Sequence, residues 1–399
     1  MRRGDARVKR LLDQASGYTL HDRRELLAVI GELLAGLMPR YARLAERGQV
    51  ELAVTPYAHP ILPLLIDFHA ARDALPDAPL PAAGHYPGGE ERARWHIREG
   101  LAAFERYFGF RPAGCWPAEG AVSRVALRLL AEAGFSWTAS SENVLAHSLA
   151  KGGHALHACK EAWLYRPYVE PNSGLSCFFR DDGLSDLIGF SYATWHADDA
   201  VANLVDHLVQ IAARCRGHAG HVVSIILDGE NAWEYYPENA YYFLDALYRR
   251  LSDHPQLTLT TFSDCRDGYP ARPLPALVAG SWVHGTFSTW IGERDKNRGW
   301  DMLVEAKRAF DRLAPGLEPA QRAAAEHELA VCEGSDWFWW FGEYNPAASV
   351  SDFERLYRLH LSNLYQLLGA EPPEHLSQVL SHGSGAPPHG GTMRPGKHE

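Results

Sequence analysis

The sequence lacks the features that mark membrane, secreted and metal-dependent proteins. No apolar run reaches the roughly 18 to 20 residues of a bilayer-spanning helix, and the first residues contain no apolar core of a signal peptide. The six cysteines are scattered without a Cys-x-x-Cys pair, which argues against a zinc cage and a disulfide framework. The 20 histidines include no His-Glu-x-x-His and no His-x-His. These absences predict a cytoplasmic protein that needs no metal ion or other cofactor.

An excess of basic residues is also absent. The formal net charge is −10 and the pI is near 6.1, whereas a nucleic-acid backbone or an anionic membrane as partner calls for clustered Lys and Arg. A neutral or small ligand therefore fits the composition better. With 399 residues, of which 46% are hydrophobic, the chain can bury a large core in one barrel domain or in two to three smaller domains.

Strand-like and helical segments alternate in the first two thirds of the chain. The hydrophobic spacing predicts helices at 26–47, 90–108, 123–133, 197–215 and 237–251, and strands at 50–55, 135–139, 175–179, 187–192, 222–227 and 257–262. Strands separated by helices of ten or more residues indicate parallel βαβ units and thus an α/β barrel or doubly wound sheet.

Only helices are predicted after residue 273, at 297–313, 319–331 and 351–368. We therefore divide the chain into a catalytic (β/α)-barrel domain at 1–273 and a helical domain at 274–370 that contributes to the active-site cleft. Residues 371–399 are rich in Gly, Pro, Ser and His, and we expect them to form a disordered tail.

The first candidate catalytic residue is Glu230, which lies just beyond the predicted strand at 222–227. Parallel barrels place their catalytic groups at the C-terminal ends of strands. A solvated surface glutamate after an ordinary Asp-Gly turn is the competing interpretation. However, Trp233, Tyr235 and Tyr236 would be exposed at the same rim without a ligand, which favours a functional site.

The second candidate is Asp336, at the head of Gly334-Ser-Asp-Trp-Phe-Trp-Trp-Phe-Gly342. Ser335 or Asp336 could simply cap a helix whose aromatic face is core. Five consecutive aromatics cannot all face one side of a helix, so some of them should line a cleft. Aromatic rings stack on the faces of sugars, and an acid that such neighbours desolvate has a raised pKa, as a general acid requires.

Five segments together resemble glycoside hydrolase family 57, specifically its amylopullulanase-like branch. They are, in chain order, Thr55-Pro-Tyr-Ala-His-Pro-Ile-Leu-Pro-Leu64, Gly114-Cys-Trp-Pro-Ala-Glu119, Leu227-Asp-Gly-Glu-Asn-Ala-Trp-Glu234, Ser288-Thr-Trp-Ile-Gly-Glu293 and the segment 334–342. The likeness extends over about residues 5 to 368. It implies an incomplete (β/α)7 barrel followed by a helical region, and a retaining attack on an α-glucan or maltooligosaccharide.

By this resemblance, Glu230 is the nucleophile and Asp336 the general acid/base, with carboxyls roughly 5 to 5.5 Å apart. The expected substrate-binding residues are His59, Trp116, Glu119, Trp233, Trp290 and Trp337. Several have a second interpretation: His59 as a core histidine, Glu119 as a partner of an arginine such as Arg180, and Trp290 as a lid on the helical core. The segment 180–186 also matches the family, but an Arg with nearby Asp most often builds a structural ion pair.

One departure from the family concerns its opening strand. Family members begin with a strand that ends in His-Gln-Pro, and this motif is absent from the chain. The resemblance therefore predicts a barrel that lacks its first strand, in a shortened chain.

The main expectation is hydrolysis of α-1,4 bonds, with α-1,6 bonds left open. A 4-α-glucanotransferase or branching enzyme and a non-catalytic glucan-binding relative are the alternatives. A metal-dependent polysaccharide deacetylase is disfavoured because an Asp and two His ligands cannot be placed.

Overall fold

The structure is a computed structural model that describes residues 4–156, 159–216, 220–229 and 232–385. The chain divides into two compact units, one of residues 1–52 and 103–111 and a larger one of residues 53–102 and 112–399. The candidate site residues that the structure describes all belong to the larger unit.

The smaller unit is built mainly from three consecutive helices. They are α1 (Ala6–Gln14), α2 (Leu20–Ala35) and α3 (Leu37–Glu46). Helix α2 begins with a capping box in which Thr19 and Asp22 satisfy each other's backbone N–H groups. Arg10 of α1 pairs with Asp22, which joins the two helices. The helix predicted over 26–47 is therefore divided at Gly36 into two helices.

Five strands of the larger unit form one sheet in the order β1-β2-β4-β3-β5. Their bounds are β1 (Gly114–Cys115), β2 (Trp137–Ser141), β3 (Tyr168–Val169), β4 (Ser176–Arg180) and β5 (Arg272–Pro273). β1, β2 and β4 are parallel, with Ser141 opposite Arg180. Single parallel bridges extend this set on both sides, from Val54 to Cys115 and from Ser224 to Arg180. The predicted parallel sheet is thus present, but the strands of the described ranges do not close into a barrel.

Two strand predictions correspond to β2 and β4, and the others need correction. The segments 50–55 and 222–227 contribute one bridge each rather than a full strand, and 257–262 contains no strand before helix α11 (Phe262–Gly268). The segment 187–192 forms the π-helical turn η4 (Leu187–Ser191) and enters η5 (Tyr192–Thr194). Short apolar runs do not distinguish a strand from a buried helical turn, and Ile188 and Tyr192 are indeed buried.

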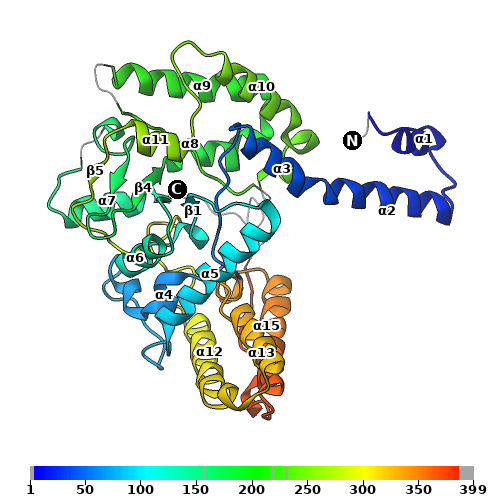
Figure 1. The fold of residues 1–399 in the computed structure, drawn as a ribbon, viewed down its shortest axis with the longest axis vertical. Helices are drawn as coiled ribbons and strands as arrows, with labels where there is room; N and C mark the ends of the chain where they lie inside the picture. The colour runs from blue at the N-terminus through cyan, green and yellow to red at the C-terminus, as the bar shows by residue number, and fades with distance from the viewer. Residues whose placement is uncertain (1–3, 157–158, 217–219, 230–231, 386–399) are drawn as a thin grey trace. The chain divides into compact units, whose positions relative to one another are not determined.

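Four of the five helices around the sheet agree closely with the sequence patterns. They are α5 (Gly89–Phe108), α6 (Arg124–Glu132), α9 (Ala197–Arg214) and α10 (Tyr241–Ser252). The fifth, α7 (Glu142–Lys151), was not predicted. Helix α6 starts where the sequence predicts because the Ser123 side chain accepts from the backbone N–H of Ala126. Helices α9 and α10 pack side by side (Figure 1). Their apolar faces share one core with the sheet.

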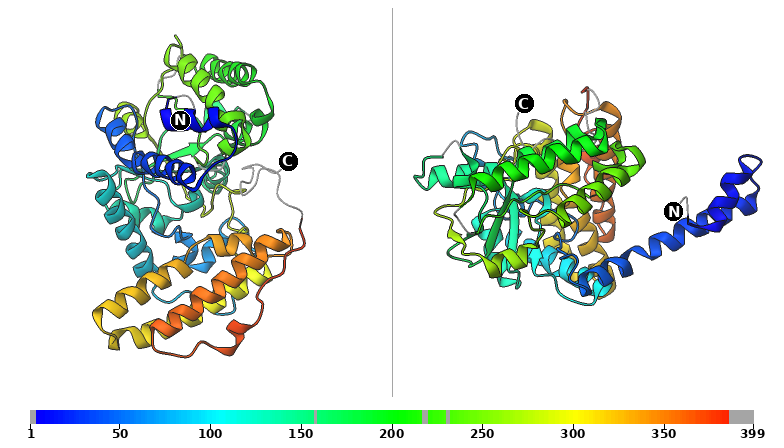
Figure 2. Two further views of the ribbon diagram at one scale, coloured as in Figure 1. Left: turned by 90° about the vertical axis from the view of Figure 1, so that its right-hand side faces the viewer. Right: turned by 90° about the horizontal axis from the view of Figure 1, so that it is seen from above.

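The C-terminal third is helical, as predicted. It contains α12 (Arg294–Leu313), α13 (Pro319–Cys332), the short α14 (Asp336–Trp340) and α15 (Ala347–Leu367). Helices α12, α13 and α15 lie together, coloured yellow to red in Figure 2. Residues 371–385, which the sequence placed in a disordered tail, pack on this region through the buried Leu376 and Leu380. The overall composition of the segment is polar, but these two leucines, four residues apart, supply the apolar contact.

Within the described ranges, no helix combines the length and the apolar character needed to cross a membrane.

Candidate active site

The parallel segments of the sheet bring three of the predicted site residues to one edge. Val54, β1, β2, β4 and Ser224 are consecutive parallel neighbours, so the chain leaves all of them at the same side. His59 follows the first segment, Trp116 and Glu119 follow β1, and Gly229 follows the last. Glu230, the predicted nucleophile, lies outside the described residues.

Trp116 and Glu119 form a cluster with Trp282, a residue that the sequence did not single out. The Trp282 indole donates a hydrogen bond to Oε2 of Glu119 at 2.7 Å, and its backbone N–H donates to the Glu119 carbonyl at 2.9 Å. The rings of Trp116 and Trp282 meet edge to face, with centroids 5.1 Å apart. Glu119 has a left-handed backbone, with φ of 58°. This conformation and the two bonds fix its carboxylate beside the aromatic pair.

Arg180, the last residue of β4, connects this cluster to the segment before Glu230. Its guanidinium lies over the Trp282 ring, 5.3 Å from the centroid, and its Nε donates to the Ile226 carbonyl at 2.6 Å. The same group pairs with Asp182 at 2.8 Å and Asp186 at 2.6 Å, which confirms the structural ion pair expected from the sequence. Arg180 therefore holds the segment 222–227 against the aromatic cluster.

The pKa values of two neighbouring acids after β4 are shifted in opposite directions. Burial raises the pKa of Asp182 to about 7, although the adjacent Arg180 acts to lower it. Burial also acts to raise the pKa of Asp181, but the charge of Lys160 and a hydrogen bond from Tyr165 outweigh it and lower the pKa. Glu142, the first residue of α7, accepts bonds from Lys160 and from the Asp182 backbone N–H at 2.6 and 3.0 Å. These contacts fix the ends of β2 and β4 relative to each other.

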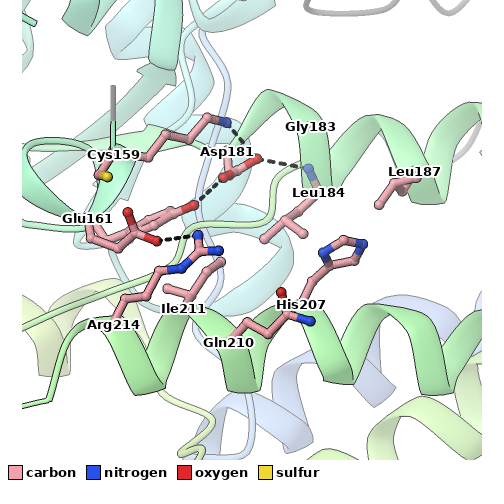
Figure 3. A pocket seen from close by; sticks show the side chains of 12 residues that line it. Cys159, Glu161, Asp181, Gly183, Leu184, Leu187, His207, Gln210, Ile211 and Arg214 are labelled. Carbon is pink, nitrogen blue, oxygen red and sulfur yellow. Dashed lines mark hydrogen bonds and ion pairs between the residues drawn. The ribbon is translucent and has the colours of Figure 1, made fainter. Parts of the chain in front are cut away.

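A hollow of about 500 Å³ lies beside this charged cluster (Figure 3). Lys160 on its wall pairs with Asp181 at 3.2 Å, and Arg214 pairs with Glu161 at 3.1 Å. These charged groups of the hollow thus pair with one another, and their arrangement does not indicate a particular ligand.

Asp336 and His59 are brought together through Ser335. The Ser335 backbone N–H donates to the His59 carbonyl at 3.0 Å, and Nδ1 of His59 is hydrogen bonded to Oγ of Ser335 at 2.7 Å. Ala58 and His59 are both left-handed, with φ of 56° and 58°. The carboxyl of Asp336, the first residue of α14, is exposed. The helical region therefore places this acid next to the segment that follows the first parallel neighbour of the sheet.

A fully buried cluster just before Ser335 supports this arrangement. The Glu333 carboxylate accepts hydrogen bonds from Arg92 at 2.8 to 3.1 Å, from Nε2 of His96 at 2.7 Å and from Tyr86 at 2.5 Å. Nδ1 of His96 lies 2.6 Å from the Tyr57 carbonyl. Each His96 nitrogen thus faces an oxygen atom, which fixes the orientation of the ring.

Burial alone would raise the pKa of Glu333, but the Arg92 charge and the hydrogen bond from His96 lower it to about 2. The cluster therefore ties α13 to the segment that carries His59 by charge-assisted bonds.

Most of the aromatic run at 337–341 is core rather than cleft. Phe338 stacks on Trp300, with centroids 4.1 Å apart and planes inclined by 8°. Trp337 is half-buried, donates its indole N–H to the Val331 carbonyl and packs against Tyr357. The expected desolvation of Asp336 by these rings is not present, because the rings turn inward while the carboxyl stays exposed.

Two further tryptophans differ from the expected platforms. Trp290 is 0% exposed, packs 5.8 Å from the Trp339 ring and presents no face to solvent. Trp290 therefore matches the alternative interpretation, in which it covers the helical core. A large apolar ring is as suitable for the protein interior as for contact with a sugar. Trp233 is half-buried against the buried Tyr236, whereas Tyr235 is 47% exposed. The predicted aromatic rim after Glu230 is thus only partly exposed.

Across the described ranges, no three His, Cys, Asp or Glu side chains are grouped so that they could hold a metal ion.

The profile of Glycosyl hydrolase family 57 matches residues 17–277, more than half of the chain. The chain belongs to glycosyl hydrolase family 57. None of the curated proteins matches the sequence of this family 57 member.

Several solved structures share the mixed α/β fold of this family 57 chain. A family 57 branching enzyme from Thermococcus kodakaraensis, solved in complex with glucose, is 17% identical, with a TM-score of 0.62 over 90% of this chain and 75% of that chain. The α-amylase AmyC from Thermotoga maritima is 16% identical, with a TM-score of 0.62 over the same shares. A 4-α-glucanotransferase from Thermococcus litoralis is 17% identical, with a TM-score of 0.56 over 86% of this chain and 52% of that chain. At these identities the likeness shows the fold alone.

Four residues that support the candidate site of this family 57 chain escaped the sequence analysis. They are Trp282 beside Glu119, Glu333 and His96 in the buried cluster, and Lys296 beneath α14. Lys296 is 0% exposed and donates to the carbonyls of Phe338 and Phe341 at the end of α14. Lys296 lies one residue before the helix predicted at 297–313, so no sequence signal indicated that it would be buried, whereas an acid directly before Gly334 was the available signal for Glu333.

Proposed function

We propose that this family 57 chain is a retaining glycosidase of the amylopullulanase-like branch that cleaves α-1,4 bonds of glucans. In this proposal the sheet belongs to an incomplete (β/α)7 barrel at 1–273, and the helical domain at 274–370 supplies the acid/base. Glu230 is the nucleophile and Asp336 the general acid/base.

The observation that carries the proposal is a continuous path of contacts between the segments that hold these two acids. On the Asp336 side, Ser335 is bonded twice to His59. Five residues before His59, Val54 accepts a hydrogen bond from the Trp116 backbone N–H at 3.0 Å. The acid of the helical region is thus linked to the aromatic cluster at the sheet edge.

The path continues from the cluster toward Glu230. Trp282 bonds Glu119 and lies against Arg180, which donates to the carbonyl of Ile226. Ile226 is four residues before Glu230. An aromatic pair and a fixed carboxylate therefore lie between the two acid-bearing segments, which is the composition of a sugar-binding site.

The reaction then proceeds in two displacements at the anomeric carbon. The Glu230 carboxylate attacks this carbon while protonated Asp336 donates its proton to the departing glycosidic oxygen. Asp336, now ionised, takes a proton from a water molecule, whose oxygen displaces Glu230 and regenerates the free carboxylate. Trp116 and Trp282 contribute ring surface for the glucose units, and Glu119 accepts hydrogen bonds from their hydroxyls.

Transfer to a second sugar is the alternative outcome of the same chemistry. In that case a glucan hydroxyl replaces water in the second displacement, which makes the enzyme a 4-α-glucanotransferase or a branching enzyme. The structural neighbours include both kinds of enzyme, which supports carrying this alternative.

The test compares Glu230→Gln with Glu234→Gln on maltoheptaose, amylose and pullulan. Glu234 is an exposed acid of the same segment and serves as the matched control. Loss of a covalent nucleophile should lower kcat by about 10³-fold or more, and loss of the acid/base in Asp336→Asn by roughly 10²- to 10⁴-fold, whereas Glu234→Gln should retain activity.

Product analysis distinguishes the alternatives. New reducing ends indicate hydrolysis, longer maltooligosaccharides indicate transfer, and new α-1,6 bonds indicate branching. The products released from pullulan, which contains both kinds of bond, distinguish α-1,6 from α-1,4 cleavage. Unchanged turnover in Glu230→Gln would refute the assignment of the nucleophile. Binding of maltoheptaose without turnover in the unsubstituted chain would identify a non-catalytic glucan-binding relative.

A further inference from the structure

A second hollow, of about 450 Å³, opens between η5, the start of α9 and the start of α10. This volume falls in the range of roughly 300 to 1,000 Å³ that is usual for small-molecule sites. None of the candidate site residues that the structure describes lines it. Its described lining thus differs from the set of proposed site residues.

The floor of this hollow is aromatic. Tyr192, Tyr236 and Phe243 are each at most 6% exposed, and their rings are in mutual contact, with Phe243 centred 6.0 Å from Tyr192 and 5.4 Å from Tyr236. The Tyr192 and Tyr236 hydroxyls donate to Asn203 and to the Ile188 carbonyl. The floor is thus rigid because its polar atoms are already bonded.

Two large aromatic rings stand at the rim. Trp195 is 44% exposed and its ring meets that of Tyr192 edge to face at 5.2 Å. Tyr242, in the first turn of α10, is 52% exposed. The exposure of these two rings around a preformed hollow is unfavourable, because each ring leaves a large apolar area in contact with water. A ligand that covered the rings would remove this area from water.

The charges around the rim determine the ligand class. Asp198 and Asp245 line the hollow together with His196, whose Nδ1 lies 4.0 Å from Asp198, and Arg249 pairs with Asp245 at 3.1 Å. Two carboxylates disfavour phosphorylated or otherwise anionic ligands. The same carboxylates accept hydrogen bonds from hydroxyl groups, so flat rings with acceptors at their edges suit a neutral polyhydroxylated molecule.

We propose that this hollow is a second glucan-binding site, with Trp195 and Tyr242 as the stacking surfaces for glucose units. The identification of the sugar as an α-glucan rests on the proposed function. The segment from Ala232 to Ala240 joins the two regions, because it begins two residues after Glu230 and contributes Tyr236 and Pro237 to the hollow. One part of a glucan polymer can thus be bound in the hollow while another part of the same polymer is cleaved.

The experiment titrates maltoheptaose into the full chain carrying Glu230→Gln, so that the sugar is not consumed. Calorimetry should show two binding events in this background. Adding Trp195→Ala or Tyr242→Ala should remove one event or raise its Kd about tenfold, which equals ~1.4 kcal/mol. Tyr248→Ala is the matched control, because Tyr248 is 59% exposed on the same helix and does not line the hollow. Circular dichroism of each variant reports whether the fold is retained.

The outcomes separate this inference from the proposed function. Two unchanged binding events in both folded variants, or a single event in the Glu230→Gln background, would overturn the second site while leaving catalysis untouched. Ring-dependent binding in a chain that turns over no α-glucan would support the second site and refute the proposed activity. With both correct, Trp195→Ala should raise KM for amylopectin and leave maltotriose kinetics unchanged.

Discussion

Replacing Glu333 by Gln tests the buried cluster that supports the acid-bearing helix. The substitution preserves shape but removes the negative charge that neutralises Arg92, whose side chain is 6% exposed, and that contacts the fully buried His96. Removing one partner of a buried ion pair typically costs about 3 to 5 kcal/mol, because the remaining charge is left uncompensated. We expect Glu333→Gln to lower the free energy of unfolding by this amount near pH 7.

The lowered pKa of Glu333 sets the pH dependence of this contribution. Its ordinary pKa is 4.5 and its pKa in the folded protein is about 2. One pKa unit corresponds to roughly 1.36 kcal/mol, so the difference of 2.5 corresponds to about 3 kcal/mol. Because the folded pKa is lowered, this stabilisation is fully present above pH 4.5 and is lost as the pH falls toward 2.

Urea unfolding between pH 7 and 3.5 measures both quantities. The control is Glu326→Gln, because Glu326 contacts the same arginine at 3.2 Å but has a side chain that is 37% exposed. An exposed partner contributes about 1 kcal/mol or less. The reasoning is refuted if the two variants lose the same stability, or if the difference between wild type and Glu333→Gln does not decrease below pH 4.5.

Two further substitutions probe the site from other sides. Trp282→Phe keeps an aromatic ring beside Arg180 but removes the indole donor to Glu119. Because a hydrogen bond to a charged group contributes about 1.5 to 3 kcal/mol, kcat/KM for maltoheptaose should fall at least tenfold. An unchanged kcat/KM would exclude Glu119 from binding. Lys296→Met leaves the carbonyls of Phe338 and Phe341 without their buried ammonium donor; thermal unfolding should show a loss of about 2 to 3 kcal/mol, with Lys151→Met, at a 51% exposed side chain, as the neutral control.

The sequence predicted the elements whose signals are local. Helix α6 has a serine cap and regular apolar spacing, and the sequence placed its bounds within a residue of those observed. The segment 187–192 was assigned incorrectly because its six apolar-rich residues carry no period long enough to distinguish a strand from consecutive tight turns.

The site was predictable in part for the same reason. Trp116, Glu119 and His59 follow recognisable strand ends, and the structure places them at one edge of the sheet. Trp282 was missed because its partners, Glu119 and Arg180, are 163 and 102 residues away in the chain. Trp290 was misplaced because a large apolar ring suits a core and a sugar platform equally well, and only its 0% exposure decides.

The pair of bonds between His59 and Ser335 has a consequence for protein engineering. Residues that have a side chain, such as Ala58 and His59, adopt the left-handed backbone at a cost of about 1 to 2 kcal/mol per residue. The hydrogen bonds with Ser335 of the helical region hold this loop in that geometry. A chimaera that exchanges the C-terminal helices for those of another enzyme would release the loop and reorient the histidine. Residues 57–60 and 331–341 must therefore be transplanted as one module.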